Sequence, residues 1–139
     1  MRYLGLDLGT RTLGIAISDR SNLIASSLEV LRFENEDYDS LLEKVKLIVE
    51  QYNITTIVLG LPKNMNNSLG SRAEVTLEFK KKLEDYLKID VFMEDERLTT
   101  VQANKYMYQN NYSKQKKKKT VDSIAACIIL QTHLDKRKG

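Results

Sequence analysis

A single carboxylate, Asp7, stands inside an otherwise apolar stretch near the start of the chain. Residues 3–9 read YLGLDLG, a pattern that predicts a buried β-strand. Because alternate side chains of a strand share a face, Asp7 lies on the same face as Gly5 and Gly9, opposite the three leucines. A carboxylate in such a strand is destabilising unless it is paired or binds a cation. The glycines leave room for another group to approach, so Asp7 is predicted to belong to a functional site.

Three other acids occupy positions where ligands commonly bind. Asp95 and Glu96 end a second apolar strand, and ligands of α/β sheets bind at the carboxyl ends of parallel strands. Asp122 falls in the first turn of an expected C-terminal helix, where the amide dipoles favour negative charge. Taken singly, Asp95 or Glu96 could pair with Arg97 or cap the next helix. Asp122 could likewise be an ordinary first-turn acid. Together with Asp7, these acids predict one acidic site at an edge of the sheet.

Carboxylates that converge repel one another, and bound divalent cations are the usual way in which proteins relieve this repulsion. The chain has one histidine, His133, and one cysteine, Cys127, which excludes an intrachain disulfide and a multi-cysteine metal site. Ligation by oxygen atoms alone suits Mg²⁺ or Mn²⁺ rather than zinc. Cys127 is expected to be a small buried residue of an apolar helix, and His133 a surface residue without a role.

Two divalent ions held about 3.5–4 Å apart form the catalytic centre of many nucleases, where they activate water and stabilise the leaving oxygen of a phosphodiester. In such a centre Asp7 would bridge both ions, while Glu96 and Asp122 would each hold one. Asp95 competes with Glu96, since strand alternation puts only one of the two on the face of Asp7. These residues predict a two-metal-ion hydrolase that acts on ester bonds.

Positive charge is concentrated next to Asp122, although the net charge of the whole chain is only +3. Five lysines precede it closely: Lys114, Lys116, Lys117, Lys118 and Lys119. A run of charges is usually a solvated segment, but its position beside an acid of the predicted site favours binding to the phosphates of a nucleic acid. Arg11 and Arg97 are also candidate phosphate ligands, because a guanidinium binds a phosphate through two parallel hydrogen bonds. The alternative role for Arg97 is to orient Glu96.

The elements that position these residues follow from turns and from the spacing of apolar residues. Three strands with short connections, which favour an antiparallel meander, come first: residues 3–8, 13–18 and 24–31. Small residues on one face of the second strand are compatible with a closely packed helix. A capping-box pair, Ser40 and Glu43, then predicts the start of a helix that ends at Asn53 in a left-handed conformation.

The second half of the chain alternates between strands and helices. Residues 56–59 are a continuous apolar run, as expected for a central parallel strand. A second capping box, Ser71 with Glu74, opens a helix whose apolar face extends to Tyr86. Residues 89–94 alternate as a fifth strand. Finally, Thr99 and Gln102 begin a further helix, a polar, lysine-rich loop is predicted next, and the last helix follows it: residues 110–120 and 121–134 respectively.

The expected fold is therefore α/β, with a five-stranded mixed sheet flanked by helices. In this sheet a three-strand antiparallel meander is joined by two parallel strands. The chain suits one domain spanning residues 1–139. It shows neither the apolar core of a signal peptide nor an apolar run long enough to cross a bilayer. We therefore expect a cytoplasmic protein with no membrane partner.

Five sequence segments occur together in an order that is specific when taken jointly. They are GLDLGT at residues 5–10, GIAISD at 14–19, VLGLPKNM at 58–65, DERLTT at 95–100 and VDSIAA at 121–126. In this order they resemble the YqgF/RuvX family over nearly the whole chain. The resemblance implies an RNase H-like fold and a metal-dependent nuclease, with Asp7, Glu96 and Asp122 as its acidic triad. It also implies a role in ribosome biogenesis, the processing of the 5′ end of pre-16S rRNA.

Alternatives from other classes remain open. The same family resemblance includes an earlier proposal that such proteins resolve Holliday junctions in DNA, which would require a symmetric dimer for paired cuts. The resemblance favours structured or precursor RNA as the partner, whereas the sequence itself chooses neither between RNA and DNA nor between a monomer and a homodimer. A non-catalytic module associated with RNA or the ribosome is a second alternative. A third is an ATPase, because DLGT at residues 7–10 resembles the phosphate loop of actin-like and sugar-kinase enzymes. Those enzymes clamp nucleotide between two domains, whereas one is expected here.

Overall fold

Five strands form one mixed sheet in the order β3-β2-β1-β4-β5. Their bounds are β1 (Arg2–Leu8), β2 (Thr12–Ser18), β3 (Ala25–Arg32), β4 (Ile54–Leu61) and β5 (Asp90–Asp95). The computed structural model describes residues 2–9, 11–34, 37–61, 71–95 and 114–138. Strands β1 to β3 pair antiparallel, while β4 runs parallel to both β1 and β5. This topology confirms the predicted meander and the two added parallel strands.

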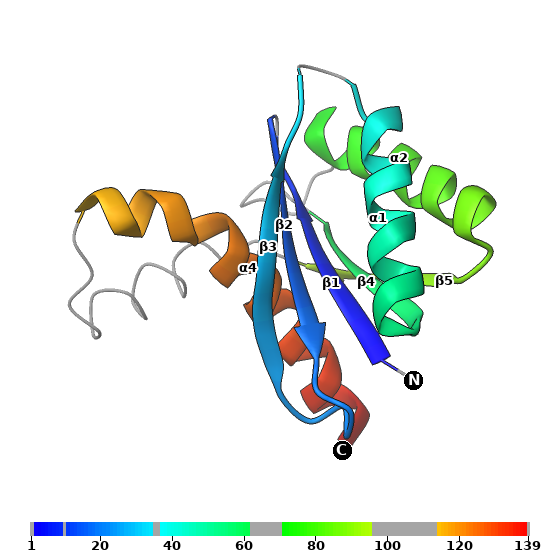
Figure 1. The fold of residues 1–139 in the computed structure, drawn as a ribbon, viewed down its shortest axis with the longest axis vertical. Coiled ribbons are helices and arrows are strands. Elements are labelled where there is room, and N and C mark those ends of the chain that lie inside the picture. The colour runs from blue at the N-terminus through cyan, green and yellow to red at the C-terminus, as the bar shows by residue number, and fades with distance from the viewer. Residues whose placement is uncertain (1, 10, 35–36, 62–70, 96–113, 139) are drawn as a thin grey trace.

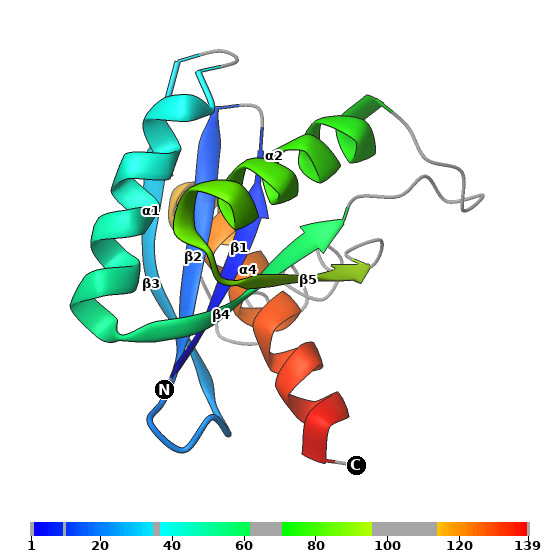
Figure 2. The same cartoon turned by 90° about the vertical axis from the view of Figure 1, so that its right-hand side faces the viewer.

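Within the described residues, three helices cover the sheet. Helices α1 (Asp39–Tyr52) and α2 (Ser71–Leu87) lie on one face, and α4 (Lys114–Lys138) lies on the other (Figure 1). Turning the molecule shows α1 and α2 in front of the sheet, with α4 behind it (Figure 2). Within the part of the chain that the structure describes, no helix is long and apolar enough to cross a membrane.

The face under α1 and α2 is a core of large aliphatic and aromatic side chains. Leu4 and Leu6 of β1 are fully buried there, together with Ile57 and Leu59 of β4. The helices contribute five more buried side chains: Leu41, Val45, Ile48, Phe79 and Leu83. The buried apolar positions of α1 recur at helical spacing, as in an amphipathic helix that packs on a sheet.

The face under α4 is lined by small residues, which let the helix approach closely. A Cβ atom added to Gly5 would lie 2.7 Å from Leu130 Cβ and 2.9 Å from the carbonyl oxygen of Ala126. Ala16 of β2 is fully buried against the same helix. The predicted packing of a helix against small residues is therefore confirmed. Cys127 is half-buried in α4, its thiol donates to the carbonyl of Ala25 at 3.2 Å, and burial raises its pKa.

Both ends of α1 test the predicted capping signals. Asn53 adopts a left-handed conformation with φ 56°, and its amide donates to the carbonyl of Val49, which confirms the predicted stop. The predicted start is wrong, because α1 begins at Asp39 and no side chain caps it. Ser40 is already helical, and its hydroxyl donates back to the carbonyl of Asp37 at 3.0 Å. The capping residue predicted for α2, Ser71, begins that helix, but its side chain lies outside the description.

Two other predictions need correction. The lysine-rich segment was expected to be a loop, but the structure makes residues 114–120 the start of α4. Lysine and glutamine are good helix formers, and the charge of the run outweighed this propensity in the prediction. Asp122 therefore lies inside a helix that begins at Lys114, not in its first turn.

The prediction that Tyr86 of α2 is buried is also wrong. Its side chain is 38% exposed, and its hydroxyl donates to Glu43 on α1, which raises the pKa of the tyrosine.

Candidate functional site

Asp7 is the predicted site residue that the structure describes most fully. It lies near the carboxyl end of β1, half-buried, and pairs across the sheet with Gly14 of β2. A tight turn follows, in which the amide of Gly9 donates to the carbonyl of Thr12 at 2.7 Å. Gly5, two residues earlier on the same strand face, contacts α4. Strand alternation therefore assigns Asp7 to the face of the sheet that α4 covers.

The register of the parallel strands brings a second acid level with Asp7. Leu6 pairs with Leu59 of β4, so Gly60 follows at the level of Asp7, and Gly60 in turn pairs with Glu94 of β5. Two strand spacings of about 4.8 Å separate β1 from β5, which sets the two acids roughly 10 Å apart. The carboxyl ends of β1 and β5 thus both present an acid toward α4.

Glu94 is a buried carboxylate that sequence reasoning did not single out. It is 6% exposed, and its Oε1 lies 3.0 Å from Nδ1 of His133, while its Oε2 accepts from Nζ of Lys136 at 2.7 Å. The His133 ring stacks on Phe92 with centroids 5.4 Å apart and tilts against Tyr3 at 5.9 Å. The imidazole of His133 and the ammonium of Lys136 compensate the burial of the carboxylate, and the cluster holds the C-terminal half of α4 against β5.

The prediction that His133 is a surface residue is wrong, since its side chain is only 15% exposed. Two signals could have revealed the cluster. His133 and Lys136 are three residues apart on a helix and so share a face. In β5, Glu94 lies two residues after Phe92, so the two side chains share one face of the strand.

The direction of α4 bears on Asp122. His133 packs on Tyr3, whereas Leu130 and Ala126 contact Gly5, so α4 runs antiparallel to β1. The backbone of residue 122 lies about one helical turn before Ala126, roughly 6 Å away along the axis of α4. The side chain of Asp122 is outside the description.

Other predicted site residues are placed in part or not at all. Arg11 is exposed in the turn after β1, at the same end of the sheet as Asp7, and its carbonyl accepts from the amide of Phe33. Asp95 ends β5, but its side chain is not described. Glu96 and Arg97 lie outside the described residues. The backbone of the five lysines forms the first turns of α4, and their side chains lie outside the described part of the chain.

A metal centre is consequently untested as a whole. Among residues 2–9, 11–34, 37–61, 71–95 and 114–138, no group of three or more potential ligands could hold a metal ion. The side chains of two of the three predicted ligands, Glu96 and Asp122, lie outside the described part of the chain. The donor chemistry of Asp7 fits Mg²⁺ or Mn²⁺, because it supplies hard carboxylate oxygens. Glu94 is already engaged by His133 and Lys136 and is not among the predicted ligands.

The arrangement of the sheet defines the fold. The fold matches RuvC from Thermus thermophilus, solved with a Holliday junction substrate, at a TM-score of 0.62 and 15% identity, covering 100% of this chain and 96% of that one. It matches a fowlpox virus resolvase, solved with Holliday junction DNA, at a TM-score of 0.62 and 15% identity, covering 100% of both chains. The fold is therefore RNase H-like.

Sequence comparison narrows the class to a family. The chain belongs to the RuvX family, because the family model described as "Holliday junction resolvase" matches residues 1–136. A relative from Clostridium botulinum, named "Putative pre-16S rRNA nuclease", is 49% identical over 135 residues, 97% of each chain. A relative of the same name from Geobacillus kaustophilus is 43% identical over 138 residues, 99% of this chain and 100% of that one. The resemblance inferred from the five sequence segments is confirmed.

Proposed function

We propose that this protein is a divalent-metal-dependent nuclease, a single catalytic domain that processes the 5′ end of pre-16S rRNA in the cytoplasm. The observation that carries the proposal is Asp7, a half-buried carboxylate at the carboxyl end of β1 on the face covered by α4. Membership of the RuvX family, the names of close relatives and a RuvC-like fold support nucleic-acid hydrolysis.

Asp7, Glu96 and Asp122 are the proposed metal ligands. Glu94 faces α4, and in a strand alternate residues share a face, so sequence parity favours Glu96 over Asp95 as the partner of Asp7. The antiparallel course of α4 along β1 favours Asp122. When bound, Mg²⁺ or Mn²⁺ supplies Lewis acidity that makes water a stronger nucleophile and neutralises charge on the scissile phosphate.

Basic residues at the same end of the sheet are the proposed nucleic-acid contacts. Arg11 is exposed in the turn directly after β1. Arg97 and the five lysines of the 114–119 run complete the set. Each phosphate that such a residue neutralises should add roughly 0.7–0.9 to the slope of log affinity against log salt. We propose RNA as the preferred substrate, bound by a monomer or a homodimer.

The direct test is cleavage by Asp7→Asn, which preserves the shape of the side chain and removes its charge. We expect pre-16S rRNA cleavage in Mn²⁺ to fall by at least about 10³-fold, with an unchanged thermal unfolding curve. Asp85→Asn, an exposed acid on α2, is the matched control and should cleave normally. Full activity of Asp7→Asn would refute the assignment.

Junction resolution is the second candidate, favoured by the description of the matching family model and by the two junction-bound structural neighbours. Competing pre-16S rRNA, single-stranded RNA and a four-way DNA junction in one Mn²⁺ reaction separates the two activities. Preferential cleavage of the RNA precursor supports the first proposal. Paired cuts in the junction by a dimeric species would support the second. A non-catalytic module would cleave none of the three.

A further inference from the structure

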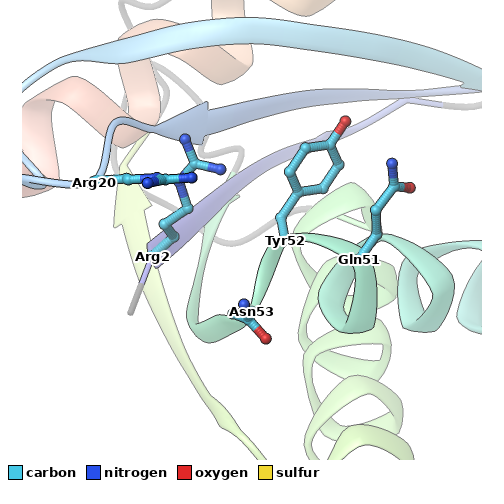
Figure 3. A pocket seen from close by; sticks show the side chains of 5 residues that line it. All are labelled: Arg2, Arg20, Gln51, Tyr52 and Asn53. Atoms are coloured by element: carbon cyan, nitrogen blue, oxygen red, sulfur yellow. The ribbon is translucent and has the colours of Figure 1, made fainter.

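A polar pocket opens at the end of the sheet opposite Asp7 (Figure 3). It has a volume of about 420 Å³ and is lined by Arg2 of β1, Arg20 of the β2–β3 turn, and three residues at the end of α1: Gln51, Tyr52 and Asn53. Along β1, Arg2 and Asp7 are separated by about 17 Å. The pocket is thus distinct from the candidate catalytic site.

Arg2 carries a buried nitrogen that lacks a partner. Its guanidinium lies over the ring of Tyr52, with 5.9 Å between Cζ and the ring centroid. Its Nε is buried and makes no hydrogen bond with the described residues. Buried donors without a partner are rare in folded proteins, so the Nε of Arg2 requires an acceptor such as an ordered water or a ligand oxygen.

Arg20 adds a second positive charge that no described carboxylate neutralises. The adjacent acid, Asp19, is committed to its own turn, where it accepts from the hydroxyl of Ser21 at 2.5 Å and from the amide of Leu23 at 2.8 Å. These hydrogen bonds lower the pKa of Asp19 to about 2. Arg20 is exposed and forms no ion pair within the described residues.

The electrostatic balance of the pocket is therefore positive. The carbonyl end of α1 contributes roughly half a negative charge, against two full positive charges from Arg2 and Arg20. Figure 3 shows these arginines on one side of the pocket, with Tyr52 and Gln51 on the other. Guanidinium pairs bind phosphate bidentately, and an aromatic ring with an amide beside it suits a planar base.

We propose that this pocket binds a nucleotide, with its phosphate held by Arg2 and Arg20 and its base against Tyr52 and Gln51. The volume falls in the range of pockets for small ligands and fits a ligand of this size. The nucleotide is either free or the terminal unit of a nucleic acid, since both present the same phosphate and base. The proposal does not depend on catalysis at Asp7.

Calorimetric titration without divalent metal tests the proposal, with inorganic phosphate, AMP, GMP and a 5′-phosphorylated trinucleotide as probes. Arg20→Ala should weaken mononucleotide binding by about tenfold or more, because it removes a charged hydrogen-bond donor. Tyr52→Leu should also weaken mononucleotide binding but leave phosphate binding unchanged. Lys44→Ala, which removes an exposed charge from α1 outside the pocket, should bind as the unmodified protein does.

The outcomes separate the sources of the ligand. Tighter binding of the trinucleotide than of AMP or GMP assigns the pocket to a nucleic-acid end, and equal or weaker binding assigns it to free nucleotides. No measurable mononucleotide binding, or equal affinity of Arg20→Ala and the unmodified protein, would overturn the proposal. Arg20 is exposed in a turn, and a thermal unfolding curve verifies that its substitution leaves the fold intact.

Discussion

The face of the sheet under α1 and α2 is packed with large aliphatic side chains, whereas the face under α4 combines small residues with two acids. On the first face, Leu4 and Leu6 of β1 are fully buried against the helices. On the second, Gly5 and Asp7 of the same strand lie beneath α4. Alternation along β1 thus separates a strand side that provides stability from one that holds the candidate chemistry.

This difference explains how one sheet can tolerate a costly acid. The aliphatic face supplies most of the apolar burial, which is the dominant favourable contribution to folding. The face under α4 is lined by small residues, which let the helix pack close to the acids. Glu94 shows the compensation that burial of a carboxylate requires, because His133 and Lys136 both contact it. The two faces should therefore respond in opposite ways to changes in side-chain size.

The largest effect on stability is expected on the aliphatic face. Leu6→Ala should lower the free energy of unfolding by about 2–5 kcal/mol, because it removes buried methyl groups and leaves a cavity. Urea unfolding followed by circular dichroism measures the change. Leu47→Ala, at a position that is 64% exposed, is the control and should change stability very little. Equal effects of the two substitutions would contradict the described core.

On the face under α4, enlarging a residue is expected to be harmful. Gly5→Ala should lower the free energy of unfolding by about 1–3 kcal/mol, because the new methyl group meets atoms fixed to the α4 backbone. Hydrogen exchange should show the loss of protection in α4, with α1 little affected. Unchanged stability and unchanged exchange in α4 would show that the helix does not pack on Gly5 as described.

The Glu94 cluster should contribute a smaller increment. Glu94→Ala should cost about 1–2 kcal/mol, since the remaining Lys136 is 66% exposed and can be solvated once its partner is lost. Thermal unfolding of Glu94→Ala measures the cost, with Glu29→Ala, an exposed acid of β3, as the control. If Glu94→Ala were as stable as the control, the contacts of Glu94 with His133 and Lys136 would not contribute to holding α4 on β5.

The smallest effect on stability is expected from Asp19, in the turn between β2 and β3. The folded-state pKa of Asp19 is lowered to about 2 from 3.8, so its stabilising contribution is complete above pH 3.8 and is lost as the pH falls toward 2. Asp19→Ala should therefore differ from the unmodified protein above pH 3.8 and converge with it near pH 2. Melting temperatures across this range test it, and a difference that grows toward low pH would contradict the assigned hydrogen bonds.

Sequence reasoning recovered the sheet because its signals are local. The alternation that buries Leu4 and Leu6, and the left-handed Asn53, depend on neighbours a few residues away. The prediction was wrong for the start of α4, because a polar, lysine-rich composition was taken as a loop although lysine and glutamine favour helix.

The candidate site was predictable only in part. Asp7 was identifiable because a charged residue within an apolar strand can be recognised from the linear sequence alone. The pairing of Glu94 with His133 was not, because these residues are far apart in the chain and meet only when α4 lies across β5. The pocket around Arg2 was hidden for the same reason, since three separate elements line it.

The central claim is that Asp7, Glu96 and Asp122 together bind divalent ions. Calorimetric titration with Mn²⁺ tests it most directly, on the unmodified protein and on four variants: Asp7→Asn, Glu96→Gln, Asp122→Asn and Asp95→Asn. We expect the first three variants each to lose at least about tenfold in Mn²⁺ affinity, because each removes a charged ligand, and Asp95→Asn to keep its affinity. Binding of Mn²⁺ by Asp7→Asn as tightly as by the unmodified protein would contradict it.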